Sequence, residues 1–187
     1  MENNMIDVIY NRQSTSKLKE PSPSHEDLLK MVKLAVTVPD HGLIEPYRFH
    51  IFQGESRAKF AEALVSSAME VKPDLSEGSQ VKIGEKAFKA PTVVAIVCQT
   101  KKCKIPRWEQ EATSACAGYA ITLGAHLLGY GAMWKSFAYS PGKQMQQLLG
   151  LGEESSLLGW INIGSTDKEH FKRERPVKNI DAFINVH

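Results

Sequence analysis

Two short segments of the chain combine residue types that can hold a charged organic ligand. Arg12-Gln13-Ser14 places a guanidinium and a hydroxyl close together, a pairing suited to a phosphate and a polyol. Trp134-Lys135-Ser136 places an aromatic ring, a cation and a hydroxyl just after a glycine-containing break. Either segment alone is also typical of a solvated turn or of ordinary core packing. Their chemistry therefore has to be judged from the whole set of segments.

Several familiar catalytic signatures do not occur in this sequence. It contains no GxSxG, HExxH, GxxxxGK or CxxC pattern, which makes hydrolase, zinc-protease and P-loop functions poor candidates. Gly129-Tyr130-Gly131 follows a predicted helix rather than a strand, so it does not match a dinucleotide-binding fingerprint. The six histidines show no i, i+4 pair, and we expect no metal site.

Composition and charge favour an intracellular globular protein. The 187 residues are 42% hydrophobic and 24% charged, enough to bury a core in one domain. A net charge of +2 does not favour nucleic acid or an acidic membrane as the main partner. The three cysteines have no paired spacing and the N-terminus does not look like a signal peptide, so we expect a cytoplasmic protein. The uncharged run 116–134 contains four glycines and predicts a helix buried in protein, at a subunit interface, rather than a membrane span.

Hydrophobic periodicity, together with the Pro and capping residues that mark the ends of elements, predicts the helices and strands that position these segments. Alternating or β-branched runs predict strands over 47–53, 91–98, 132–136 and 157–164. Helical spacing predicts helices over 5–11, from the Ser24 cap to the Pro39 stop, over 56–71 and 106–128, and from Ser140-Pro141 onward. The charged segment 72–89 is expected to be a mobile or variable excursion. Strands separated by longer helices indicate one α+β domain, a three-layer sandwich around a mixed sheet of four or five strands.

In this order the segments resemble the nitroreductase family of FMN-dependent oxidoreductases, in particular its compact branch. The residues that carry the resemblance are Asn11-Arg12-Gln13-Ser14, Val38-Pro39-Asp40-His41 with Pro46-Tyr47, Phe88-Lys89-Ala90-Pro91, the run 106–111, the run 129–136, and Gly159 with Ile163-Gly164. The resemblance implies a single nitroreductase-like α/β/α domain over 1–187, with a mixed, mainly antiparallel sheet. It also implies a domain-swapped type of homodimer, in which the C-terminal arm 165–187 packs on the partner subunit.

The same resemblance implies FMN at the subunit interface, reduced by NADH or NADPH. The acceptor would be a small molecule such as a nitroaromatic or a quinone, and the flavin itself would carry the chemistry without a catalytic side chain. Arg12 and Ser14, with Gln13 beside them, match the family residues that hold the phosphate and the polar side of the flavin. Arg173 and Arg175 match a basic pair that many members place against the phosphate.

Further positions carry over from the interface and from the flavin-lining segment. His41 would approach the flavin from the other subunit, and Trp134-Lys135-Ser136 would line the isoalloxazine. Thr37 stands where the family often has an arginine, and Ser16 where larger members have a lysine near flavin N1. Lys135 is therefore our candidate for electrostatic support of the reduced flavin.

Two other functions stay open on the sequence. One is a flavin-binding carrier or regulator without significant turnover. The other is a cofactor-free interaction module that uses its C-terminal arm.

Overall fold

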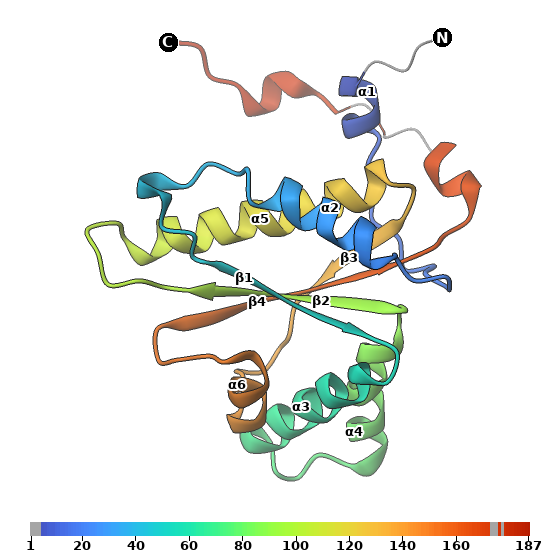
Figure 1. Cartoon of the computed structure of the whole chain (residues 1–187), viewed down its shortest axis with the longest axis vertical. Coiled ribbons are helices and arrows are strands. Elements are labelled where there is room, and N and C mark those ends of the chain that lie inside the picture. Colours follow the sequence, from blue (N-terminus) through green and yellow to red (C-terminus); the bar gives the residue numbers. More distant parts are fainter. Residues whose placement is uncertain (1–4, 173–175, 177) are drawn as a thin grey trace.

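The centre of the fold is a four-stranded sheet with the order β1-β2-β4-β3. A computed structural model describes residues 5–172, 176 and 178–187 of the chain. The strands are β1 (Tyr47–Gln53), β2 (Thr92–Gln99), β3 (Gly131–Lys135) and β4 (Ser155–Gly164). In β2 all side chains but the last are buried, as expected for its β-branched run between two helical layers (Figure 1).

All three strand pairings in this sheet are antiparallel, whereas we expected a mixed, mainly antiparallel sheet. The connections explain the difference. A pair of helices joins β1 to β2. The chain leaves β1 and enters β2 at the same end of the sheet, so these two neighbouring strands run in opposite directions. A single helix joins β2 to β3, which makes those two strands parallel, but β4 lies between them and is antiparallel to both.

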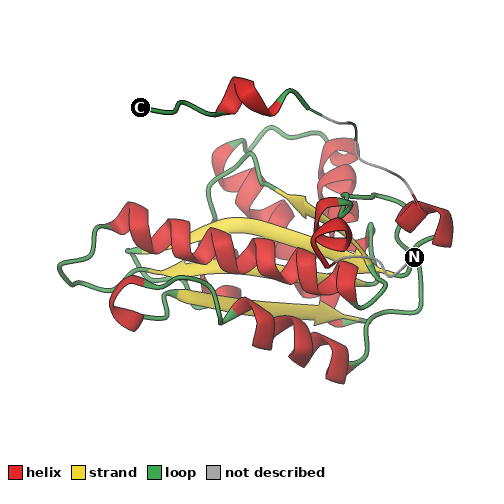
Figure 2. Ribbon diagram, turned by 90° about the horizontal axis from the view of Figure 1, so that it is seen from above, coloured by secondary structure: helices red, strands yellow, loops and turns green. Residues whose placement is uncertain are grey.

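Helices cover both faces of the sheet and form the expected three layers (Figure 1). One layer consists of α2 (His25–Ala35) and α5 (Arg107–Leu127), and Figure 2 looks onto this layer with the strands behind it. The other consists of α3 (Ser56–Val71), α4 (Glu77–Gly84) and α6 (Lys143–Leu149). Each layer has its own buried apolar cluster against the sheet, one centred on Phe60 and Trp160, the other on Met31 and Ile121.

The start of α2 shows how local sequence fixes an element. The Ser24 hydroxyl caps the helix by accepting a hydrogen bond from the Asp27 amide at 3.1 Å. The Tyr130 hydroxyl in turn donates to Asp27 Oδ2 at 2.8 Å, which ties the end of α5 to the start of α2. That hydrogen bond is the main cause that lowers the pKa of Asp27. The Ser24 cap predicted from the sequence is confirmed.

The segment 72–89 is more regular than its composition suggested. It contains α4 and a 3-10 turn, η2 (Glu85–Phe88), and these helical elements were not predicted from the sequence. Ile83 and Ala87 are its buried anchors, and both belong to the cluster beneath α3. Two buried apolar residues in a charged stretch are too few to show a helical period in the sequence.

Helix α1 (Met5–Tyr10) and the C-terminal segment lie on the outer side of α5 (Figure 1). The C-terminal segment contains the short turns η3 (Lys168–Lys172) and η4 (Ile180–Phe183), and Phe171 of η3 borders the same depression as Val8 of α1. Ile180, Phe183 and Val186 expose 55%, 71% and 91% of their surface, so this segment carries apolar side chains without burying them. Across the described ranges, no helix is both long and apolar enough to traverse a bilayer.

Candidate functional site

A pocket of about 370 Å³ lies at the β3 edge of the sheet, on the side of α3 and α4. Its lining comes from four segments that are distant in the sequence: Ser16, Lys86, Lys89, Met133, Lys135, Ser136, Trp160 and Asn162. Its size is within the range of about 300–1,000 Å³ that is usual for small-molecule sites. Two of the residues predicted from the sequence, Lys135 and Ser136, are among its walls.

Strand pairing explains why these side chains meet. Side chains alternate across a strand, so Met133 and Lys135 point to one face of β3. Met133 is opposite Asn162 and Lys135 is opposite Trp160 in the β3–β4 register. The four side chains therefore form a continuous patch, and Trp160 places that patch in the layer of Phe60 and α3.

Three lysines give the pocket its charge. The Lys86 ammonium lies 5.9 Å from the centroid of the Phe137 ring, and Lys89 Nζ lies 3.4 Å from Glu85 Oε2. Lys135 is half-buried. Within the described part of the chain, no carboxylate forms an ion pair with Lys86 or Lys135. The pocket thus offers positive charge to an anionic or electron-rich ligand.

Two polar atoms of the pocket lining are buried and have no hydrogen-bond partner among the described residues. They are the indole nitrogen Nε1 of Trp160 and the amide oxygen Oδ1 of Asn162. The two residues are only 1% and 2% exposed. Buried polar groups are nearly always hydrogen-bonded, so these two atoms are exceptions in the wall between β3 and β4.

The N-terminal segment crosses the β3 edge and joins the two sides of the sheet. The Arg12 guanidinium lies 5.8 Å from the centroid of the Tyr119 ring on α5. The Thr15 amide donates to the carbonyl of Ala132 at 3.1 Å, and Ser16 then lines the pocket. Three residues lie between Arg12 and Ser16, so four residue steps of at most about 14 Å in extended chain join them. Arg12 and the pocket are therefore close enough to contact the two ends of one mononucleotide.

Close packing of this segment depends on Gly131. A Cβ atom at that position would lie 2.7 Å from Thr15 Cγ2 and 2.8 Å from Leu18 Cδ2. Only glycine lets the N-terminal segment lie against the start of β3. The glycine break that precedes Trp134 in the sequence thus has a definite packing role.

The other predicted residues of the N-terminal segment lie near Arg12. Ser14 is exposed and Gln13 is half-buried. The Arg12 charge also affects α5: burial is the main cause that lowers the pKa of His126, and Arg12 contributes in the same direction. The structure therefore places the predicted phosphate-binding segment beside α5 and not inside the pocket.

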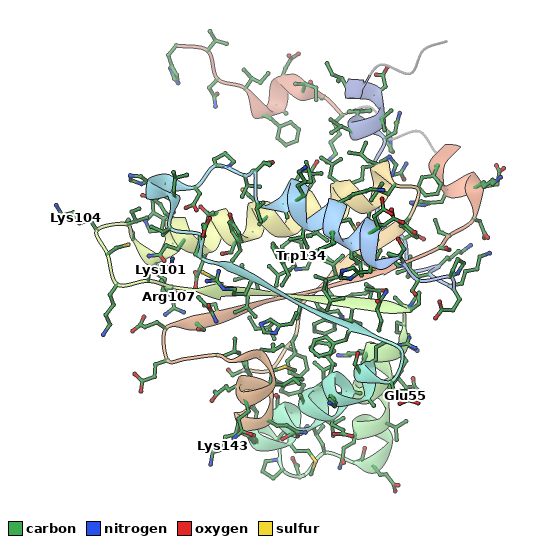
Figure 3. The ribbon with its side chains drawn as sticks, in the orientation of Figure 1. Glu55, Lys101, Lys104, Arg107, Trp134 and Lys143 are labelled. Carbon is green, nitrogen blue, oxygen red and sulfur yellow. The ribbon has the colours of Figure 1, made fainter. Side chains whose placement is uncertain are left out.

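Three predicted residues lie in the layer of α2 and α5, on the far side of the sheet from the pocket. The Trp134 side chain points toward that layer, and its Nε1 donates to the Leu158 carbonyl at 3.2 Å (Figure 3). Thr37 Oγ1 donates to the Leu34 carbonyl at 2.8 Å. His41 Nδ1 lies 2.8 Å from Glu109 Oε2, with 71% of its side chain exposed. Within one chain, the structure thus brings none of these three side chains to the pocket.

Arg173 and Arg175 lie outside the described residues. The sequence-based prediction of a basic pair against a phosphate therefore has no structural counterpart here.

Six residues of the pocket were given no site role by reasoning from the sequence: Ser16, Lys86, Lys89, Met133, Trp160 and Asn162. Lys89 belongs to a motif that carried the family resemblance, but it received no role. Asn162 stands inside the otherwise apolar strand Trp160–Gly164. An amide at a buried strand position was the available signal.

Two other concave surfaces are less suited to an anionic ligand. A shallow groove of about 750 Å³ between α3 and α4 is mainly apolar and bordered by Glu62 and Glu70. A smaller depression of about 230 Å³ at the start of α5 is bordered by Lys101 and Arg107 (Figure 3). There Arg107 is already paired with Glu111, with Nε 3.0 Å from Oε1.

Comparison with known proteins places this pocket in a family context. The sequence profile described as "Nitroreductase family" matches residues 9–165. The chain belongs to the nitroreductase family. The nitroreductase relative YdjA of Escherichia coli (strain K12), named "Putative NAD(P)H nitroreductase YdjA", is 30% identical over 165 residues, which cover 86% of this chain and 87% of the relative.

Solved structures show the same fold. The crystal structure of a nitroreductase-like family protein from Bacillus cereus has a TM-score of 0.81 at 20% identity, covering 100% of this chain and 97% of that chain. The FMN-dependent nitroreductase NfnB from Mycobacterium smegmatis, in complex with NADPH, has a TM-score of 0.73 at 14% identity, covering 98% and 97%. The nitroreductase fold predicted from the sequence is confirmed.

Proposed function

We propose that this protein is an FMN-dependent NAD(P)H oxidoreductase that passes electrons to a small acceptor such as a nitroaromatic or a quinone. The observation that carries the proposal is the pocket at the β3 edge, with its three lysines. Family membership and the names of the relatives support the reaction class. The M. smegmatis neighbour is an FMN-dependent nitroreductase in complex with NADPH, which supports the cofactor pair.

The donor set of the pocket fits FMN. A flavin ring system carries carbonyl oxygens and an N–H along one edge, and it gains electron density on reduction. Lys86, Lys89 and Lys135 provide cations, while Ser16 and Ser136 provide hydroxyl groups. Arg12, across the sheet edge, is the nearest predicted partner for the phosphate, which carries about two negative charges at neutral pH.

The residues of the pocket would bind the flavin, orient it and stabilise its charge. FMN, when bound, supplies the hydride-transfer chemistry. Lys135 Nζ stabilises negative charge in the pocket, and Lys86 adds to that effect from η2. Met133 and Trp160 exclude water from the wall formed by β3 and β4. No side chain of the pocket has to transfer a proton for the flavin to be reduced by nicotinamide.

We also infer that the working unit is a homodimer. Leu43, Trp108 and Tyr119 expose 84%, 67% and 47% of their surface on or beside the layer of α2 and α5. The C-terminal arm 165–187 adds exposed Phe183 and Ile184. Burial of these side chains against a second copy would remove apolar surface from water. In such a dimer His41 of one subunit would face the flavin of the other, as the family resemblance implies.

An absorbance spectrum of freshly purified protein tests the proposal directly. We expect flavin absorption bands and their bleaching on anaerobic addition of NADH or NADPH, followed by recovery when an electron acceptor is added. A protein that binds no FMN, even when reconstituted, refutes the proposal. A yellow protein that neither nucleotide reduces is a carrier instead.

The phosphate assignment is tested by replacing Arg12. Arg12→Ala should weaken FMN binding, whereas Lys143→Ala removes a cation of α6 that lies outside the pocket lining and should not. The comparison of the two dissociation constants separates a specific contact from the loss of one positive charge. Equal FMN affinities for Arg12→Ala and the wild type would show that the phosphate is held elsewhere.

A further inference from the structure

Arg57, in the first turn of α3, joins three parts of the fold through its guanidinium group. Its Nε donates to the Gly54 carbonyl at 3.1 Å, and its Nη1 donates to the Ala90 carbonyl at 2.7 Å. The guanidinium carbon lies 5.5 Å from the centroid of the Phe88 ring. A planar guanidinium can donate along its edge and stack through its face at the same time. This half-buried side chain therefore holds the turn before α3 and the segment before β2 together.

The segment that Arg57 contacts carries two of the three pocket lysines. Lys89 lies between Phe88 and Ala90, the two residues of this segment that touch the guanidinium. Lys86 lies two positions before Phe88 and also lines the pocket. Ala90 is only 2% exposed, so the hydrogen bond from Arg57 fixes a carbonyl at the edge of the core. Both lysines thus extend from a backbone that Arg57 holds.

The ammonium groups of these two lysines have few constraints of their own. Lys89 Nζ lies 3.4 Å from Glu85 Oε2, but both side chains are more than half exposed, and such a pair contributes little. Lys86 Nζ lies 5.9 Å from the centroid of the Phe137 ring. A lysine side chain is a flexible four-carbon stem. The position that each ammonium group can reach therefore depends on how firmly its backbone is held.

The contacts of Arg57 differ from those of a surface ion pair. Among the residues that the structure describes, no carboxylate forms an ion pair with this guanidinium. Both of its hydrogen bonds go to main-chain carbonyl groups, and one of these immediately follows Lys89 in the chain. A charged donor makes a shorter and stronger hydrogen bond to such a carbonyl than a neutral one. Arg57 is thus arranged to hold backbone rather than to neutralise an acid.

We propose that Arg57 is a positioning residue for Lys86 and Lys89. It holds the backbone of residues 88–90 against α3 and so keeps both ammonium groups directed into the pocket, where they meet an anionic ligand. Arg57 is not part of the pocket lining, so it acts only through the two lysines. This inference rests on the proposed function, because it takes the ligand to be FMN. It adds to the site a residue of α3, a helix that does not itself line the pocket.

Titration of the apoprotein with FMN tests this dependence in two double-mutant cycles. Replacing Lys86 and Lys89 together by methionine should weaken FMN binding about tenfold or more when Arg57 is present, because charge-assisted contacts are lost. In an Arg57→Met background the same replacement should weaken binding by less than about threefold, since the lysines are no longer held in place. Lys135→Met lies on β3 and should weaken binding by the same factor with and without Arg57. Fluorescence quenching of the flavin measures each dissociation constant and does not depend on turnover.

Matched variants separate positioning from the loss of one positive charge. Lys59 is the next cation on α3, exposed and outside the pocket lining. Lys59→Met should leave the effect of the lysine pair at its full size. If Arg57→Met does not fold, as judged by circular dichroism, Arg57→Lys replaces it in both cycles, because an ammonium group keeps the charge but lacks the planar fork that bonds both carbonyl groups.

Three results overturn the inference while leaving the proposed function intact. One is a lysine pair whose removal has the same effect with and without Arg57, which would make Arg57 merely structural even if its variant melts at a lower temperature. The second is a Lys135→Met effect that declines equally without Arg57, which would indicate general damage to the pocket. The third is an FMN affinity that does not depend on Lys86 and Lys89. Failure of the proposed function looks different, because then the wild-type protein binds no FMN.

Discussion

The contact between helix α5 and strand β3 is tight enough for a single methyl group to disturb it. Gly118 is buried in α5, and a Cβ atom built there would lie 2.3 Å from Cη2 and 2.4 Å from Cζ3 of Trp134. Carbon atoms pack at about 3.5–4.0 Å, so the methyl of Gly118→Ala falls more than about 1 Å short of normal contact. The Trp134 ring or the helix would have to move.

The size of the effect follows from comparison with a second glycine. Gly78 also lies in a helix, α4, but a Cβ atom there would meet nothing within 4 Å. Replacing glycine by alanine in a helix gains up to about 1 kcal/mol of intrinsic propensity, most of which is common to both sites. Overpacking costs about 1–3 kcal/mol. Gly118→Ala should therefore be about 1–3 kcal/mol less stable than Gly78→Ala.

Thermal unfolding of the two variants measures this difference. For a chain of this size, 1 kcal/mol shifts the melting temperature by about 2–4 °C, so we expect Gly118→Ala to melt about 2–12 °C below Gly78→Ala. Adding Trp134→Leu should recover part of the loss, because the smaller side chain leaves room for the methyl. Equal melting temperatures for the two single variants would refute the argument from the Gly118–Trp134 contact.

Three further predictions concern charge, pH and assembly. Lys135→Met should lower the midpoint potential of the bound flavin by a few tens of millivolts, since about 1.4 kcal/mol corresponds to about 30 mV for two electrons. An unchanged potential in a spectroscopic redox titration would show that Lys135 does not stabilise the reduced flavin. Burial lowers the pKa of both His50 and His126, so the unfolded chain binds more protons as the pH falls below about 6.5. The melting temperature should therefore fall between about pH 7.5 and 5.5, and less steeply in a variant with glutamine at both positions. Phe183→Ser with Ile184→Ser should weaken the dimer in sedimentation experiments, and a wild-type chain that is a flavin-loaded monomer at micromolar concentration would contradict the proposed assembly.

Elements with strong periodicity were predictable from the sequence. Strand 47–53 and helix 56–71 have the predicted limits, because alternation and helical spacing are local properties. The helix predicted over 106–128 and the strand predicted over 132–136 match α5 and β3 to within one residue at each end. The 72–89 segment was not predictable, since its helix depends on contacts of Ile83 and Ala87 with the rest of the core.

The candidate site was predictable only where it coincided with a family motif. Lys135 was identified in that way, and the pocket contains it. Asn162 and Trp160 were read as part of an apolar strand, because nothing in the local sequence shows which residues of β3 will lie opposite them. Register arises from the pairing of distant segments, and a site built across two strands and a turn cannot be assembled from local patterns.

A ligand in the pocket should increase the local stability of α4 and η2, because of the way this segment is attached to the rest of the fold. This segment packs mainly on α3 and on itself, and its anchors are the two buried side chains Ile83 and Ala87. It supplies Lys86 and Lys89 to a pocket whose other walls belong to β3 with Ser136 after it, to β4 and to the N-terminal segment at Ser16. A ligand that binds both parts must oppose opening of the segment, since it binds the closed form preferentially. The backbone amides of α4 should thus exchange hydrogen with solvent more slowly when the pocket is filled, while those of β2 should change little.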